Sequence, residues 1–213
     1  MDEPHAKTDK PAPMPLAGIT VVELGTSLAA PYATMVLAQL GAEVIKVESP
    51  RGGDPARRWG PPISEGNSIT YQAVNRDKRS VTVDFSDPSA REKLGVFIAE
   101  HADVCVQNMR PKAVDGLGLG ADALTARNSR LIYCNMGAYG SKGPLSHLPG
   151  YDPLIQAFSG ICHVTGPADG DPCRLGVPVI DIGTGMWAVI GIQAALMRRH
   201  ETGQGGVVDV SLF

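Results

Sequence analysis

The fold is decided by the stretch Ile19–Glu48, ITVVELGTSLAAPYATMVLAQLGAEVIKVE. It opens with a short β-branched run, Ile19–Leu24, and closes with a second, Glu43–Glu48, and each is typical of a buried strand. Between them Pro31 suits the first turn of a helix that runs to about Leu40, with Gly41 as its stop. A strand, a helix and a strand with short links predict a βαβ unit with parallel strands and a right-handed crossover.

The same alternation continues along the chain. Further strands are expected at 81–85, 103–107, 130–136 and 207–213, and helices at 88–101, 121–127, 151–162 and 181–200. Asp87-Pro88 is the start signal of the first of these helices. A long irregular stretch rich in Pro, Gly and Arg occupies 49–67. Repeated βα alternation predicts an α/β fold: an open, mostly parallel, Rossmann-like sheet with helices on both faces.

Composition narrows the class of protein. A hydrophobic fraction of 43% with 19% charged residues describes a globular chain, and a net charge of −3 gives no bulk attraction for nucleic acid or an anionic membrane. The apolar run Met186–Met197 is too short to span a bilayer. Four widely spaced cysteines form no metal or disulfide pattern and indicate a reducing, cytoplasmic location. Residues 1–15, rich in Pro and charge, are expected to be a disordered lead-in, with one domain over 16–213.

Asp181 stands between an apolar run, VPVI, and the small-residue helix start IGTG. The plainest interpretation is a helix N-cap, whose carboxylate accepts the first free N–H groups. A helix N-terminus would also keep the carboxylate ionised and fixed in direction, and an ionised carboxylate is a nucleophile that needs no general base. Gly183 and Gly185 could leave room for a substrate, or could serve helix packing.

An ordered set of motifs resembles the class III CoA-transferase family. They are LAGITVVEL at 16–24, AP at 30–31, LGAEVIKVE at 40–48, NRDKRS at 75–80, LGLG at 117–120, GYD at 150–152, VIDIGTG at 179–185, AAL at 194–196 and TGQG at 202–205. The resemblance runs from about residue 15 to the last residue. It implies coenzyme A or an acyl-CoA as substrate, a small carboxylic acid as its partner in exchange, and no metal.

By this resemblance Asp181 is the nucleophile. Its carboxylate would attack the thioester to give an aspartyl-acyl anhydride and CoA thiolate, and the thiolate or an incoming carboxylate would then attack. The related 2-methylacyl-CoA racemases instead use a His in a Gly-His-Asp motif together with this Asp. Here the motif reads Gly150-Tyr151-Asp152. Tyrosine titrates near pH 10 and is a poor base at neutral pH, which disfavours the racemase alternative.

The resemblance also implies a set of CoA contacts. These are Leu28, Ala29, Ser49, Val83, Asp84, Phe85, Ser86, Asn108, Met109, Arg110, Pro149, Gly150, Tyr151 and Asp152. The phosphates of CoA require cations, and the chain offers Lys46, Arg51, Arg57, Arg58, Arg76, Lys78, Arg79, Arg110 and Lys112. For most of these the alternative is an ordinary solvated surface charge.

Two departures from the family are visible. Gly116 stands where relatives commonly carry Arg, so one charge contact to CoA is absent or supplied elsewhere. Full-length relatives are about twice as long, with a smaller second domain and an interlocked homodimer, so that domain is expected to be missing here. The chain could therefore be an inactive CoA-binding fragment.

A nicotinamide dehydrogenase is disfavoured, because Gly25–Pro31 (GTSLAAP) is not a G-x-G-x-x-G turn.

Overall fold

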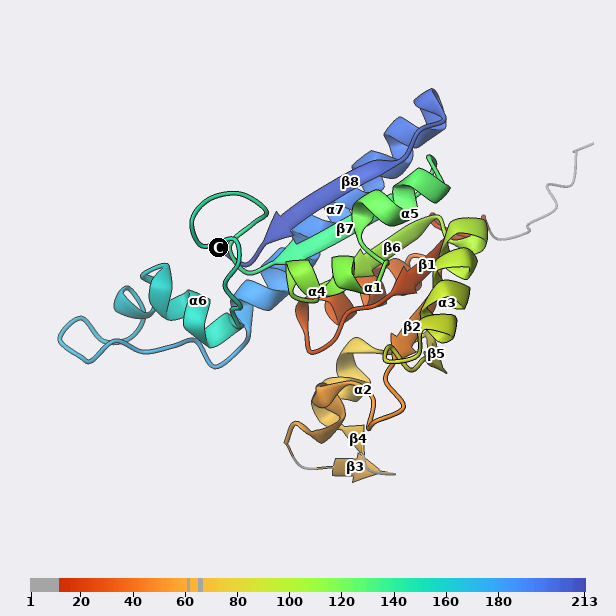
Figure 1. Cartoon of the computed structure of the whole chain (residues 1–213). Helices are drawn as coiled ribbons and strands as arrows, with labels where there is room; N and C mark the ends of the chain where they lie inside the picture. Colours follow the sequence, from red (N-terminus) through yellow and green to blue (C-terminus); the bar gives the residue numbers. More distant parts are fainter. Residues whose placement is uncertain (1–11, 61, 65–66) are drawn as a thin grey trace, which may run out of the picture.

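The computed structural model describes residues 12–60, 62–64 and 67–213, so the expected lead-in falls largely outside the described residues. Its central feature is a six-stranded sheet (Figure 1). The strands are β1 (Thr20–Glu23), β2 (Glu43–Glu48), β5 (Lys78–Thr82), β6 (Val104–Gln107), β7 (Ile132–Gly137) and β8 (Gly206–Ser211). A separate small antiparallel pair joins β3 (Pro62–Ser64) to β4 (Asn67–Ser68).

The strand order of the large sheet is β5-β2-β1-β6-β7-β8, and every pairing in it is parallel. The chain winds from β1 outward to β5, then returns to the centre and winds the other way from β6 to β8. The reversal therefore lies between β1 and β6. In open α/β sheets this switch point opens a crevice at the carboxyl ends of the strands, where ligands bind.

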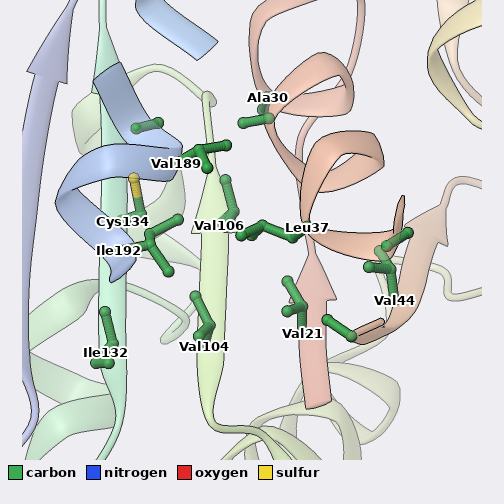
Figure 2. Close-up of a cluster of buried hydrophobic side chains, with 14 of the residues drawn as sticks. Val21, Ala30, Leu37, Val44, Val104, Val106, Ile132, Cys134, Val189 and Ile192 are labelled. Carbon is green, nitrogen blue, oxygen red and sulfur yellow. The ribbon is translucent and has the colours of Figure 1, made fainter. Parts of the chain in front are cut away.

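Helices cover both faces of the sheet, as the sequence predicts. On one face lie α1 (Ala29–Gln39) and α7 (Val179–Thr202), and on the other lie α3 (Pro88–His101), α4 (Pro111–Gly116) and α5 (Ala121–Arg127). Each face has its own apolar core. Figure 2 shows the α1–α7 side, where Leu37 of α1 and Ile192 of α7 meet β-branched side chains of the central strands.

The connections hold the remaining elements, which are η1 (Pro55–Arg58), α2 (Ile69–Val74), α6 (Asp152–Phe158) and η2 (Ile161–His163). The expected irregular stretch 49–67 thus contains η1 and the β3–β4 pair. The expected helix over 151–162 is two elements, because Gly160 adopts a left-handed conformation (φ 84°) that ends α6. α2 and α4 have no counterpart among the helices expected from the sequence.

The strand expected over 81–85 is wrong by three residues at each end, because β5 begins at Lys78 and ends at Thr82. Its register against β2 pairs Val44 with Lys78 and Glu48 with Thr82. β5 is an edge strand, and charged residues are common on edges. The polar residues Lys78, Arg79 and Ser80 therefore belong to the strand, although their sequence does not resemble that of a buried strand.

α7 is also longer than its apolar centre suggested. It has 24 residues, and by length and composition alone it could cross a membrane. The run Met186–Met197 is the centre of this longer helix, so the length of the run alone did not decide the question. A core helix has the same composition, and here one face of α7 is buried on α1 and the sheet. The opposite face carries exposed apolar side chains, at Met186, Trp187, Ile190 and Met197.

A buried ionic network joins β1, β2 and β5 beneath the switch point. The Glu23 carboxylate accepts hydrogen bonds from Lys46 Nζ at 2.6 Å, Lys78 Nζ at 2.9 Å and Thr34 Oγ1 at 2.6 Å. Lys46, only 1% exposed, is also 2.9 Å from the Asp54 carboxylate. Burial alone lowers the pKa of Lys46, but Glu23 and Asp54 more than offset this and raise it above its ordinary value.

Candidate active site

A pocket of about 130 Å³ lies at the carboxyl ends of β1 and β6 and includes Asp181. Five parts of the chain build it: the β1–α1 loop with the start of α1, the β6–α4 loop, the end of β7 with the segment that follows it, the first turn of α7, and the residue after β8. Its lining consists of Thr26, Ser27, Leu28, Ala29, Asn108, Met109, Arg110, Met136, Gly137, Ala138, Ser146, His147, Leu148, Pro149, Gly150, Tyr151, Asp181 and Leu212. This is the position that the strand order predicts for a ligand site.

Side-chain hydrogen bonds hold two of these loops in place. The Asn108 amide accepts from Thr26 N at 2.9 Å and donates to Thr26 O at 2.8 Å, which ties the β6–α4 loop to the β1–α1 loop. Ser27 has a positive φ of 71°, a costly conformation for a residue with a side chain. Its N–H donates to the Asp54 carboxylate, with N–O distances of 3.0 and 3.2 Å. The buried ionic network therefore fixes the loop conformation.

The structure corrects the expected role of Asp181 as an N-cap. α7 begins at Val179 with Pro178 as its N-cap, so Asp181 is the third residue of the helix. The carboxylate that accepts the first N–H groups belongs to Asp152, which receives Ile180 N at 2.8 Å and Asp181 N at 3.2 Å. The capping side chain thus comes from another helix, which leaves the Asp181 carboxyl group to line the pocket.

Asp181 does not titrate as the sequence suggested. Burial, and secondarily the negative charge of Asp152, raise its pKa to about 7. The α7 dipole acts in the opposite direction but is outweighed. The expectation that the helix N-terminus keeps this carboxylate fully ionised is therefore wrong near neutral pH. A carboxyl group that titrates in this range and faces a pocket is a candidate functional group.

The glycines after Asp181 have different surroundings. A Cβ on Gly185 would lie 2.7 Å from a Tyr32 ring carbon and 3.0 Å from Ala29 O, so this glycine lets α7 approach α1 closely. A Cβ on Gly183 would meet nothing within 4 Å. The packing explanation thus applies to Gly185, and open space remains beside Gly183.

A second, larger pocket of about 610 Å³ adjoins the first. The two share Met109, Arg110, Met136, Gly137, Ser146 and His147 in their linings. Lys112 lines the larger pocket, and Arg110 lines both, so two of the expected cations lie where an anionic ligand could reach them. A Cβ on Gly116, the position of the missing family Arg, would meet nothing within 4 Å.

Other expected cations are used inside the protein. Lys46 and Lys78 pair with Glu23, and Arg57 pairs with Glu48 at 2.7 Å. These three side chains were named as available for a CoA phosphate, with a solvated surface charge as the alternative, and the structure instead places each in an internal ion pair. The reason is positional, because Lys46 and Lys78 lie on strands beside β1 and their side chains reach Glu23 of β1.

Several predicted CoA contacts lie outside both pockets. Ser49 follows β2, and the group Val83, Asp84, Phe85 and Ser86 follows β5. Val83 and Phe85 pack against the core on the α3 side, while Arg51 Nη2 donates to Ser86 Oγ at 3.2 Å. Asp152 is 4% exposed and does not line the smaller pocket, although its neighbour Tyr151 does. Their contact with CoA stays a prediction.

The sequence did not single out Asp54, Ser146 or the loop role of Ser27. His147 lies outside the motifs of the sequence and also lines both pockets. No local signal identifies these residues, because each owes its place to a loop conformation. Within 12–60, 62–64 and 67–213, no cluster of three or more His, Cys, Asp or Glu is arranged to hold a metal ion.

The chain is similar to a set of known proteins. The model of CoA-transferase family III matches residues 16–213. Succinyl-CoA:glutarate CoA-transferase of Mus musculus is 43% identical over 199 residues, covering 93% of this chain and 45% of that protein. Succinate–glutarate CoA-transferase of Agrobacterium fabrum is 41% identical over 205 residues, covering 93% and 51%.

Solved structures agree with this similarity. A crystal structure of a CAIB/BAIF family protein from Brucella suis matches with a TM-score of 0.90 and 44% identity, covering 95% of this chain and 54% of that one. The chain spans about half the length of the curated relatives it matches.

Proposed function

The chain belongs to CoA-transferase family III, and on this basis we propose that it transfers CoA between an acyl-CoA thioester and a carboxylic acid, with Asp181 as the acyl carrier. The observation that carries the proposal is the place of the Asp181 carboxyl group. It lines the switch-point pocket together with Leu28, Ala29 and the Asn108–Arg110 loop. Relatives named for succinyl-CoA and glutarate make a short dicarboxylic acid the substrate class to test first.

In the proposed reaction the ionised Asp181 carboxylate attacks the thioester carbonyl. The C–S bond breaks, CoA leaves as its thiolate, and an aspartyl-acyl anhydride remains. The thiolate then attacks the Asp181 carbonyl and releases the donor acid. CoA is now held as a thioester of Asp181. The acceptor carboxylate attacks this thioester, which expels the thiolate and forms a second anhydride; the thiolate then attacks the acceptor acyl carbonyl, which gives the new acyl-CoA and frees the Asp181 carboxylate.

The pocket offers groups for the charges that develop. Ala29 begins α1, and first-turn N–H groups of a helix have no partner within the helix, so they are suited to stabilise an oxyanion. Arg110 and Lys112 would hold anionic parts of the substrate. All parallel strands end at one edge of the sheet, so a ligand as long as CoA could extend from β1 past β2 to Ser49 and the 83–86 segment.

The pKa of Asp181 gives the proposal a pH dependence. Only the ionised carboxylate is nucleophilic, and burial raises its pKa to about 7. We therefore expect the rate of acyl-enzyme formation to be near its plateau at pH 8 and to fall about tenfold for each unit below pH 6. Loss of substrate charge contributes little in this range, because carboxylic acids titrate lower.

The test is trapping of the activated carboxylate. The chain is mixed with succinyl-CoA, then with hydroxylamine, and its intact mass and peptide map are measured. We expect a hydroxamate on Asp181, no adduct in Asp181→Asn, and an unchanged adduct in Asp169→Asn, a matched change at an exposed loop residue. Absence of a hydroxamate while CoA still binds would refute the proposal for this chain and support the fragment alternative. Exchange of the α-proton in D2O without a hydroxamate would support the racemase alternative.

For the whole protein we propose a CoA-binding domain over 16–213, an interlocked homodimer and a cytoplasmic location. The exposed apolar face of α7, which includes Trp187 at 67% exposure, is the kind of surface that another protein segment covers. Sedimentation of the 213-residue chain would test dimer formation.

A further inference from the structure

A chain of buried side-chain hydrogen bonds reaches from α6 to the first turn of α7. Asp152 Oδ2 accepts from Ile180 N and Asp181 N, and its other oxygen accepts from Gln156 Nε2 at 2.5 Å. The side-chain oxygen of Gln156, Oε1, in turn accepts from Leu175 N at 2.8 Å. Asp152 and Gln156 are both buried, and they stand one helical turn apart on α6.

This arrangement replaces the usual means of starting a helix. Pro178, the N-cap of α7, makes no side-chain capping bond. The first N–H groups of a helix need a partner when they are buried. Asp152 of α6 supplies this partner. Gln156, also on α6, accepts a hydrogen bond from Leu175 N and so holds the segment that leads into α7. The position of Asp181 relative to the pocket therefore depends on α6.

We propose that Asp152 is a positioning residue for Asp181, which orients the carrier carboxyl group by binding the main chain on which it stands. This inference rests on the proposed role of Asp181 as acyl carrier. It differs from the expected contact of Asp152 with CoA, because both carboxylate oxygens of Asp152 are bonded within the protein. The carboxylate is also a fixed negative charge beside Asp181 and makes that group harder to ionise.

The charged and titratable groups around Asp181 make the effect separable. Asp152 of α6 accepts a hydrogen bond from Asp181 N, while Arg110, His147 and Tyr151 line the same pocket as Asp181. Replacing Asp152 by Asn removes the negative charge and keeps an acceptor oxygen for Ile180 N and Asp181 N, while its NH2 group takes the place of the oxygen that accepts from Gln156 Nε2, so that one bond is lost. Replacing it by Ala removes both. The two variants therefore distinguish charge from position.

The first measurement is an NMR titration of the Asp181 side-chain carboxyl group in the whole 213-residue chain. In Asp152→Asn we expect its midpoint to fall by about one pH unit, because a like charge has been removed while the burial that raises the pKa remains. The control Asp169→Asn should leave the midpoint unchanged. An unshifted midpoint in Asp152→Asn would overturn the electrostatic part of the proposal.

The second measurement is hydrogen exchange at the amides of Ile180 and Asp181. We expect exchange at least tenfold faster in Asp152→Ala, and near-native exchange in Asp152→Asn, with thermal unfolding confirming that both variants fold. Native exchange in Asp152→Ala would overturn the positioning role. If Asp152→Ala does not fold, Gln156→Leu serves in its place, since it leaves the Asp152 carboxylate with one partner fewer and should speed exchange at these amides.

Activity then links position to chemistry. Acyl-enzyme formation in Asp152→Ala should lose kcat by tenfold or more with little change in KM, and Asp152→Asn should restore most of kcat and shift the acid limb to lower pH. A loss confined to KM would indicate a CoA contact and contradict the inference. The NMR and exchange results require no acyl-CoA. If they appear as expected while no chain forms a hydroxamate, the positioning role stands and the proposed reaction fails.

Discussion

Two glycines on one helix should respond in opposite ways to the same substitution. Gly185→Ala places a methyl group 2.7 Å from the Tyr32 ring and 3.0 Å from Ala29 O, whereas Gly183→Ala places one in open space. Within a helix the exchange of Gly for Ala stabilises by about 1 kcal/mol. The Tyr32 ring can rotate away, but Ala29 O is main chain of α1 and cannot, so overpacking should cost about 1–3 kcal/mol.

The comparison isolates the packing cost, because the helix propensity gain is common to both variants and cancels. We expect Gly183→Ala to raise the free energy of unfolding by up to about 1 kcal/mol. The free energy of unfolding of Gly185→Ala should be about 1–3 kcal/mol lower than that of Gly183→Ala. Urea unfolding followed by circular dichroism measures both, with equal m-values as the check for two-state behaviour. Equal stabilisation of the two variants would refute the close approach of α7 to α1 at Gly185.

Other outcomes follow from the buried charges and caps. Glu23→Gln leaves two buried ammonium groups short of a partner and should lower the free energy of unfolding by about 3–5 kcal/mol, while Arg79→Met on the exposed edge should change it by less than about 0.5 kcal/mol. Asp87→Ala removes the cap bond to Ser89 N and should cost about 1 kcal/mol, measurable by thermal unfolding. The folded pKa of Asp181, about 7, exceeds its ordinary 3.8, so the folded chain holds this proton more tightly and loses that advantage as pH rises from about 4 to 7. Asp181→Asn should therefore stabilise the chain at pH 8, by at most about 4 kcal/mol, and have little effect at pH 4, which unfolding curves at the two pH values would test.

Local patterns predicted the elements that are buried or clearly capped. The helix 121–127 has the predicted bounds, and α3 begins after Asp87, whose carboxylate accepts from Ser89 N. The strands near the switch point lie within one or two residues of their expected places. These elements depend on periodicity and on side chains adjacent in sequence, which a single sequence displays.

Edges and loops could not be predicted in the same way. β5 uses charged residues because it is an edge strand, and its start depends on the register with β2. The left-handed Ser27 depends on Asp54, which is 27 residues away. The start of β5 and the conformation of Ser27 are set by residues that are distant in sequence and meet only in the fold. A short stretch of sequence therefore cannot predict them.

For the candidate site, the sequence by itself determined that Asp181 stands at the start of a helix and that the chain follows a family pattern from residue 16 onward. Only the tertiary structure decided that Asp152 caps the helix, that Asp181 is free to line the pocket, and that its proton is held to about pH 7. The physical reason is that capping and chain direction are local, whereas burial and charge proximity arise when α6 and α7 meet.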